Sequence, residues 1–127
     1  MFRKIPLIIL ILILLIGCET PLPELSPIDK VTADTLDINA EYLRELLAKP
    51  LYEFNEKDVD TYLPYLQYTI PDLRERMKHL ARKNLGQAYE IYLLGEYPVE
   101  IYDRQPLYIL DKSDCVVFTE HILAMAM

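Results

Sequence analysis

The stretch DKSDCVVFTE (residues 111–120) predicts a tight polar turn that delivers one cysteine to the start of an apolar helix. Ser113 or Asp114 can cap this helix by accepting hydrogen bonds from its first N–H groups. Cys115 then lies in the first turn, where the helix dipole favours a thiolate, the nucleophilic form, over a thiol. The carboxylate of Asp114 acts against this effect, because it disfavours a second negative charge beside the sulfur.

The composition is typical of one small globular domain. The chain has 127 residues, of which 52% are hydrophobic and 26% charged, and its formal net charge is −7,. Arg3 and Lys4 are the only charged residues before position 18, so the rest of the chain has 11 basic and 20 acidic residues, a net charge of −9. This acidity argues against a nucleic-acid partner, because phosphate contacts need a basic surface.

Residues 1–18 are predicted to be a lipoprotein signal peptide. Arg3 and Lys4 precede an apolar run over residues 7–16, which is shorter than the ~20 residues needed to span a bilayer,. The ending Leu15-Ile16-Gly17-Cys18 resembles the bacterial lipobox, whose cysteine is lipidated, as with palmitate, and becomes the new N-terminus. An uncleaved N-terminal membrane anchor is the alternative.

Both interpretations place the rest of the chain outside the cytoplasm. Glu19 follows the lipid site, where an aspartate would resemble an inner-membrane retention signal. In a two-membrane cell we therefore expect a lipid-anchored protein on the outer membrane, facing the periplasm. In a single-membrane cell we expect it on the outer face of the plasma membrane.

The cysteine count bears on Cys115. The chain has two cysteines, and lipidation uses Cys18. In an oxidising compartment, a cysteine without an intrachain partner is a reactive thiol or an intermolecular pairing site. The competing interpretation is a buried cysteine that behaves as a small hydrophobe, which is the commoner case for a lone cysteine.

Residues 19–38 are predicted to be a flexible tether, because Pro21, Pro23 and Pro27 lie among acidic and small residues,. We assign the domain to residues 39–127, and three helical patterns open it. The first spans about 39–49 and ends at Pro50,. The second spans about 56–68 with Asn55 as N-cap, and an internal proline at position 64 predicts a kink or a split into two short helices.

The third helical pattern spans residues 71–85, with Pro71 in its first turn and Gly86 as its C-terminal stop,. His79 lies on it and is predicted to be a surface or boundary histidine. Its basic face could touch anionic cell-wall polymer, but such a face is more often simply solvated. That face comprises Arg74, Arg76, Lys78, Arg82 and Lys83.

After Gly86 the pattern changes to short β-type runs at residues 90–94, 99–102 and 107–110,. Tyrosines in and between these runs could wall a substrate groove, although packing explains most of them equally well. These are Tyr92, Tyr97, Tyr102 and Tyr108.

Two short elements resemble one protein family. The Asp-Cys pair at 114–115, followed by β-branched residues, Phe118 and Thr-Glu, looks like the nucleophile helix of papain-like bacterial cell-wall cysteine hydrolases. These are the NlpC-type peptidases and the related N-acetylmuramoyl-L-alanine amidase-like lipoproteins. The run Leu-Gly-Gln-Ala-Tyr at 85–89 resembles the Leu-Gly-x-Pro-Tyr element of that family, with Ala88 in place of the proline. The resemblance covers residues 73 to 127.

This resemblance implies an α+β fold, of which the chain holds the mostly helical N-terminal lobe of a papain-like domain. It implies that Cys115 is the nucleophile and that Tyr89 and Asp114 line the substrate cleft. The substrate would be a peptidoglycan stem peptide or the lactyl–peptide amide. In this family the catalytic histidine lies on a strand after the nucleophile helix.

This chain has no later strand that could carry the histidine. His121 follows Cys115 by six residues on the same predicted helix, which puts it about 120° round the axis and out of reach,. That helix is apolar on nearly every face, which predicts a place in the middle of a core. We therefore expect a truncated protein that lacks its antiparallel sheet and is inactive alone, or a chain completed by a partner subunit.

Three functional hypotheses follow. The first is a lipid-anchored cysteine hydrolase, either peptidase or amidase, whose partners are peptidoglycan and the membrane lipid. The second is a non-catalytic lipoprotein that binds or scaffolds. The third is an unrelated membrane-tethered helical protein. Reactivity of the Cys115 thiol distinguishes the first from the second, and a Cys115 packed in the core without a cleft would favour the third. We expect no metal or cofactor, because the histidines and cysteines lack ligand spacing and no phosphate-binding glycine loop is present,.

Overall fold

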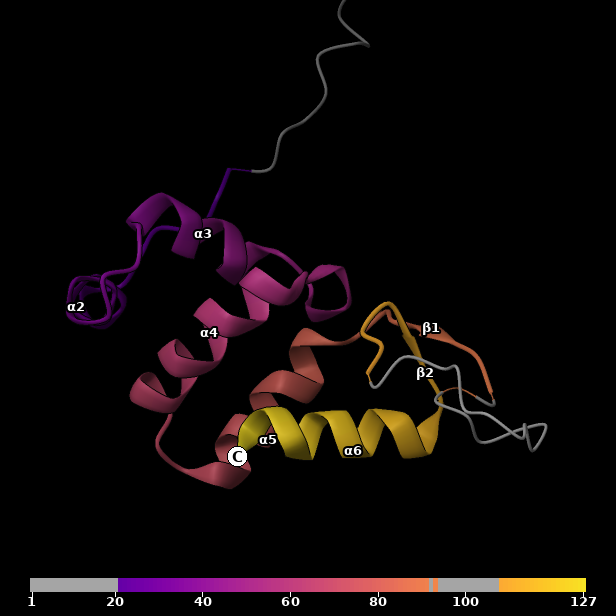
Figure 1. Ribbon diagram of the computed structural model, residues 1–127. Coiled ribbons are helices and arrows are strands. Elements are labelled where there is room, and N and C mark those ends of the chain that lie inside the picture. Colours follow the sequence, from indigo (N-terminus) through magenta and orange to yellow (C-terminus); the bar gives the residue numbers. More distant parts are fainter. Residues whose placement is uncertain (1–20, 92, 94–107) are drawn as a thin grey trace, which may run out of the picture.

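The computed structural model describes residues 21–91, 93 and 108–127. This part is mostly helical with one small two-stranded parallel sheet, which is compatible with the α+β class (Figure 1). No helix in these ranges is both long and apolar enough to cross a membrane. The elements are α2 (Pro27–Thr35), α3 (Ala40–Ala48), the 3-10 turn η1 (Leu51–Glu53), α4 (Glu56–Thr69), α5 (Leu73–Lys83), β1 (Ala88–Tyr89), β2 (Lys112–Ser113) and α6 (Cys115–Ala126).

Side-chain caps explain where α3 and α4 begin. The Asn39 side chain accepts hydrogen bonds from Glu41 N at 2.9 Å and Tyr42 N at 3.0 Å,. Asn55 and Asp58 form a capping box, in which each side chain accepts a bond from the backbone N–H of the other,. The structure confirms both predicted helices at these positions.

The predicted split of the second helix at Pro64 does not occur, because α4 is one helix from Glu56 to Thr69. A proline at this position cannot donate a hydrogen bond to the carbonyl of Asp60. Both Pro64 and Asp60 are exposed. Water can therefore satisfy that carbonyl, and the helix continues past the proline.

Residues 27–35 form helix α2, which corrects the prediction that residues 19–38 are a flexible tether. Ser26 Oγ accepts a bond from Asp29 N at 3.2 Å, and the Asp29 carboxylate accepts one from Ser26 N at 2.9 Å. Pro27 follows in the first turn, where a helix leaves N–H groups without partners and a proline loses nothing. The proline that suggested a linker is thus part of a helix start.

Contacts with α4 hold α2 in place. Thr32 and Ala33 are buried, and Tyr65 Oη donates a hydrogen bond of 2.6 Å to the Asp29 carboxylate. Burial acts to raise the pKa of Asp29, but hydrogen bonds from Ser26 and Tyr65 outweigh it, so that the pKa is lowered,. The packed domain therefore begins before residue 39.

The core is built around Tyr62 of α4, whose side chain is fully buried. Its ring meets Phe54 edge-on with 5.2 Å between centroids and stacks on Tyr65 at 5.7 Å,. Aliphatic side chains from the surrounding elements complete this core, namely Leu43, Leu46, Leu51, Leu66, Leu80, Ile122 and Ala126.

Arg76 of α5 bonds to the ends of neighbouring helices, although the sequence analysis placed it on a basic face that is solvated or touches anionic polymer. Its guanidinium donates hydrogen bonds to Ala126 O at 2.7 Å and to Ile70 O and Pro71 O, both at 2.8 Å. Ala126 ends α6 and Ile70 is the C-cap of α4. Such terminal carbonyls lack intrahelical partners, and a positive charge suits the negative end of the helix dipole.

Lys83 makes the corresponding contact with α3. Its ammonium donates hydrogen bonds to Leu46 O at 2.7 Å and Leu47 O at 3.1 Å, both in the last turn of α3. It also lies 4.9 Å from the Tyr62 ring centroid and 5.3 Å from that of Phe54,. Burial lowers the pKa of Lys83 to about 8. Two cations predicted to be solvated thus hold helix ends.

Helix α6 is buried on one face only, although its sequence predicts burial all round. It packs against α5 and α4, and Figure 1 shows it along one edge of the described helices. The buried positions are Val117, Ile122 and Ala126, while Val116, Leu123 and Met127 are 49%, 42% and 72% exposed.

The sheet differs from the predicted strands. β1 and β2 pair in parallel, with Ala88 opposite Lys112 and Tyr89 opposite Ser113. The predicted runs at 90–94 and 107–110 lie partly outside the described residues, and their described residues are not in strands. The run at 99–102 lies wholly outside. The observed pairing joins segments that are distant along the chain, and local sequence patterns do not predict such pairings.

Replacing Arg76 with methionine should lower the free energy of unfolding by about 2 kcal/mol, because three carbonyls lose a charged donor,. Arg74→Met is the matched control, since Arg74 is exposed on the same helix, and it should change stability by less than about 0.5 kcal/mol. Urea unfolding followed by circular dichroism measures both. Equal values for the two variants would contradict this role of Arg76.

Candidate active site

Cys115 is the first residue of α6, and its side chain is exposed. This confirms the predicted helix start, and the interpretation as a buried small hydrophobe is wrong. The sulfur therefore lies at the positive end of a helix whose last residue, Ala126, is held by Arg76,. An exposed thiol in this position suits a nucleophile.

Asp114 is the N-cap of α6. One carboxylate oxygen, Oδ1, accepts hydrogen bonds of 2.8 Å from both Val116 N and Val117 N. Of the two predicted caps, Asp114 is therefore the one used, and Ser113 belongs to β2. Asp114 is only 7% exposed, and its place in a substrate cleft stays a prediction.

The cap also limits which N–H groups could bind an oxyanion. Val116 N and Val117 N already donate to Asp114. The remaining candidate in the first turn is the N–H of Cys115 itself, which belongs to the same residue as the sulfur. A single backbone donor of this kind needs a second donor from elsewhere to form a complete oxyanion hole.

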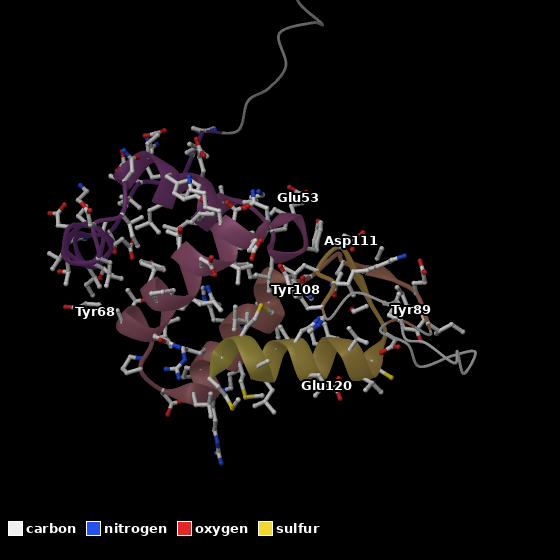
Figure 2. All side chains as sticks on the ribbon, in the orientation of Figure 1. Glu53, Tyr68, Tyr89, Tyr108, Asp111 and Glu120 are labelled. Carbon is white, nitrogen blue, oxygen red and sulfur yellow. The ribbon has the colours of Figure 1, made fainter. Side chains whose placement is uncertain are left out.

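Tyr89 lies beside the start of α6. The parallel pairing puts it opposite Ser113, two residues before Cys115, and its side chain is 72% exposed. Figure 2 shows Tyr89 at the end of the described structure where α6 begins. The fold thus brings the tyrosine and the cysteine that the sequence analysis singled out to the same end of the molecule.

A polar network anchored on Gln87 positions this end. Gln87 Oε1 accepts hydrogen bonds from Ser113 Oγ at 2.5 Å and Asn84 Nδ2 at 2.6 Å, and Gln87 Nε2 donates to Leu110 O at 2.6 Å. Ser113 and Asn84 are buried. The network ties the end of α5 to the residues that lead into Cys115. Sequence analysis missed Gln87, because only the strand pairing brings it to Ser113.

His79 belongs to the edge of the core. Its Nε2 lies 2.8 Å from Tyr62 Oη, and the residue is half-buried, as predicted for a boundary histidine. Burial lowers the pKa of His79, and the charges of Lys83 and Arg82 lower it further,. His79 is therefore neutral at pH 7 and is engaged with α4.

His121 lies six residues after Cys115 on α6, which corresponds to a rise of roughly 9 Å. Burial lowers the pKa of His121, and Glu120 opposes this effect. Among the described residues, neither His79 nor His121 forms a hydrogen bond with Cys115. This part of the chain thus presents a thiol without a bonded base.

Several predicted features lie outside the described residues. These include Cys18 with the rest of the segment 1–18, and Tyr92, Tyr97 and Tyr102 of the suggested groove. Tyr108 is described and is 51% exposed. Within residues 21–91, 93 and 108–127, no three His, Cys, Asp or Glu side chains are grouped to hold a metal ion.

No protein-family model matches this chain, and comparisons with curated proteins and with solved structures find no match either. Its function is therefore inferred from the residues and the geometry described above.

The Asp114→Ala variant should lower the free energy of unfolding by about 1 kcal/mol, because Val116 N and Val117 N lose their acceptor,. Asp114→Asn keeps an acceptor oxygen at the same position and should retain most of the stability. Urea unfolding of the two variants and the parent chain provides the comparison. An Ala variant as stable as the Asn variant would show that the cap contributes little.

Proposed function

We propose that this chain is part of a lipid-anchored cysteine hydrolase that cleaves amide bonds in peptidoglycan, as a peptidase or an amidase. The observation that supports this is the exposed Cys115 at the capped start of α6, with Tyr89 beside it. In this proposal the chain forms the helical N-terminal lobe of a papain-like, NlpC-type domain. The antiparallel sheet of that domain would carry the histidine that Cys115 needs.

The proposed reaction proceeds through a thioester. The Cys115 thiolate attacks the amide carbonyl carbon, a C–S bond forms, and the negative charge moves to the carbonyl oxygen. The N–H of Cys115 donates to that oxygen. The C–N bond then breaks as a histidine protonates the leaving amine, and water hydrolyses the thioester to release the acid. The described lobe alone should therefore bind substrate at most.

The membrane anchor is a separate part of the proposal and rests on sequence alone. Residues 1–18 carry a basic start, an apolar run and the ending Gly17-Cys18. Lipidation at Cys18 would hold the domain at the envelope membrane and bring it close to peptidoglycan. Residues 21–26, before α2, would be the link between anchor and domain.

A non-catalytic lipoprotein that binds or scaffolds is the second candidate. It is favoured by the fact that neither described histidine hydrogen-bonds Cys115. It is also favoured by the Asp114 cap, which takes up two of the N–H groups at the helix start. The reactivity of the thiol separates the two candidates.

In a Cys18→Ser background, the hydrolase proposal expects iodoacetamide to alkylate native Cys115 faster than it alkylates Cys115 in the urea-unfolded chain at pH 7, because an active-site nucleophile is more reactive than an ordinary thiol. Adding Asp114→Asn removes a nearby negative charge and keeps the cap acceptor, so this variant should react faster still. A native rate equal to or below the unfolded rate would favour the non-catalytic candidate.

The anchor has its own test in bacterial cells supplied with labelled palmitate. The full chain and its Cys115→Ala variant should both incorporate the label and sediment with membranes. The Cys18→Ala variant should not incorporate it, because the acceptor thiol is gone. Label on Cys18→Ala, or none on the parent chain, would contradict lipidation at Cys18 without affecting the role proposed for Cys115.

A further inference from the structure

The residues that lead from the proposed anchor at Cys18 to α2 are held on the domain. Arg44 of α3 donates hydrogen bonds to Leu22 O at 3.1 Å and to Pro23 O at 3.0 Å. Leu25 is buried and belongs to the hydrophobic core. The chain is therefore fixed to the domain from Leu22 onward, and Leu22 is only four residues after Cys18.

This short connection limits how far the domain can move from a lipid on Cys18. Four residues of fully extended chain reach at most about 14 Å. A folded chain of roughly 100 residues has a radius of gyration of about 13 Å, so its diameter is larger than that reach. A domain anchored so closely does not turn freely, and one of its surfaces must face the bilayer.

Helix α2 begins five residues after Leu22 and presents an apolar stripe to solvent. Ile28 and Val31 are 67% and 61% exposed, although both side chains are aliphatic. Together with Thr35 they are spaced i, i+3 and i+7, so they lie along one side of the helix,. The Thr35 hydroxyl donates to Val31 O at 2.7 Å, so this polar group has a partner without water.

Neighbouring side chains suit the same surface. Tyr68 of α4 is exposed, and Tyr65, three residues earlier, bonds to Asp29 of α2. Figure 2 shows Tyr68 at the end of α4 that lies on the side of α2, and the two helices are in contact. Tyrosine combines an apolar ring with a polar hydroxyl, which suits the boundary between a bilayer and water. The two exposed charged residues of α2, Lys30 and Asp34, have opposite signs and offset each other.

A second apolar stripe lies on α6, which exposes Val116, Leu123 and Met127. Figure 1 shows α6 on the opposite side of the described helices from residues 21–26, which follow the anchor. A bilayer that is held close to Leu22 therefore meets α2 and not α6.

We propose that α2 rests on the membrane, with Ile28, Val31 and Tyr68 among the lipid headgroups. The proposal rests on lipidation at Cys18, and its chosen partner is the bilayer itself. Three side chains contribute little affinity alone, but a lipid anchor gives them a high effective concentration at the surface. They orient a domain that the lipid already holds, and this orientation turns α6 and Cys115 away from the bilayer.

The test uses the lipoprotein purified from bacterial cells and reconstituted in vesicles of phosphatidylethanolamine and phosphatidylglycerol. In a Cys115→Ser background, a thiol-reactive fluorophore is attached through Val31→Cys or, as a control on α6, through Leu123→Cys. Lipid that carries a nitroxide on its headgroup should quench the fluorophore at position 31 and leave the one at position 123 unquenched. No quenching at position 31, or equal quenching at both positions, would overturn the proposal.

Failure of the anchor is scored separately, because a chain without a lipid on Cys18 does not sediment with the vesicles. That result would overturn both the anchor and the orientation. A chain that sediments but shows no quenching at position 31 would overturn the orientation alone. Emission at position 31 that shifts to the blue without quenching would mean that protein, such as a second copy of the chain, covers α2, and it would also overturn the proposal.

Matched substitutions test the side chains themselves. Ile28→Asn combined with Tyr68→Asn should reduce quenching at position 31, because both changes remove apolar groups from the membrane contact. Leu123→Asn combined with Met127→Asn makes equivalent changes on α6 and should leave that quenching unchanged. All four residues are exposed, so neither pair should unfold the chain, and circular dichroism checks this,. Quenching that the first pair leaves as strong as in the parent lipoprotein would overturn the proposal.

Discussion

Two cations on α5 satisfy carbonyl groups at the ends of three other helices, and the packing of the described helices depends on these contacts. Arg76 donates to carbonyls at the ends of α4 and α6, and Lys83 donates to the last turn of α3. The last carbonyl groups of a helix have no hydrogen-bond partner within it. Burying them beside another helix therefore costs free energy unless another residue supplies a hydrogen-bond donor. Supplying these donors from a single helix couples the positions of the other three.

This coupling reaches the candidate site through α6. Asp114 holds the N-terminal end of α6 and Arg76 holds its C-terminal end. The network around Gln87 holds the residues that precede Asp114. Cys115 is therefore presented by a helix fixed at both ends, on a surface where Tyr89 is also exposed. Such a fixed frame orients a nucleophile, but it supplies no base, since the described histidines bond or pack elsewhere.

Local capping signals account for the correct helix predictions. Asn39, Asn55 and Asp114 each accept hydrogen bonds from N–H groups two or three residues further on. Asn55 was predicted as a cap and Asp114 as one of two possible caps, whereas position 39 was predicted only as the approximate helix start. The same signal was present at Ser26 and Asp29, but Pro27 between them was interpreted as a linker residue. The prediction of a flexible tether was wrong because Pro27 also suits the first turn of a helix, and the residues on either side of it form a capping box.

The wrong predictions about which side chains of α5 and α6 are buried have a different cause. Periodicity assigns side chains to faces of a helix, but it does not say which neighbour lies against each face. Arg76 and Lys83 belong to the polar face by spacing, and they turn to carbonyls that only packing brings close. Likewise α6 is apolar all round, and nothing in its own sequence indicates that Val116 and Leu123 would be exposed in the described structure.

The sequence by itself determined the starts of α3, α4 and α6, and hence the place of Cys115 in a first helical turn, because a cap involves residues within about three positions of one another. Only the tertiary structure decided that Tyr89 lies opposite Ser113 and that Gln87 bonds to Ser113 Oγ. These contacts join residues that are distant along the chain, and their free energy depends on every element packed between them.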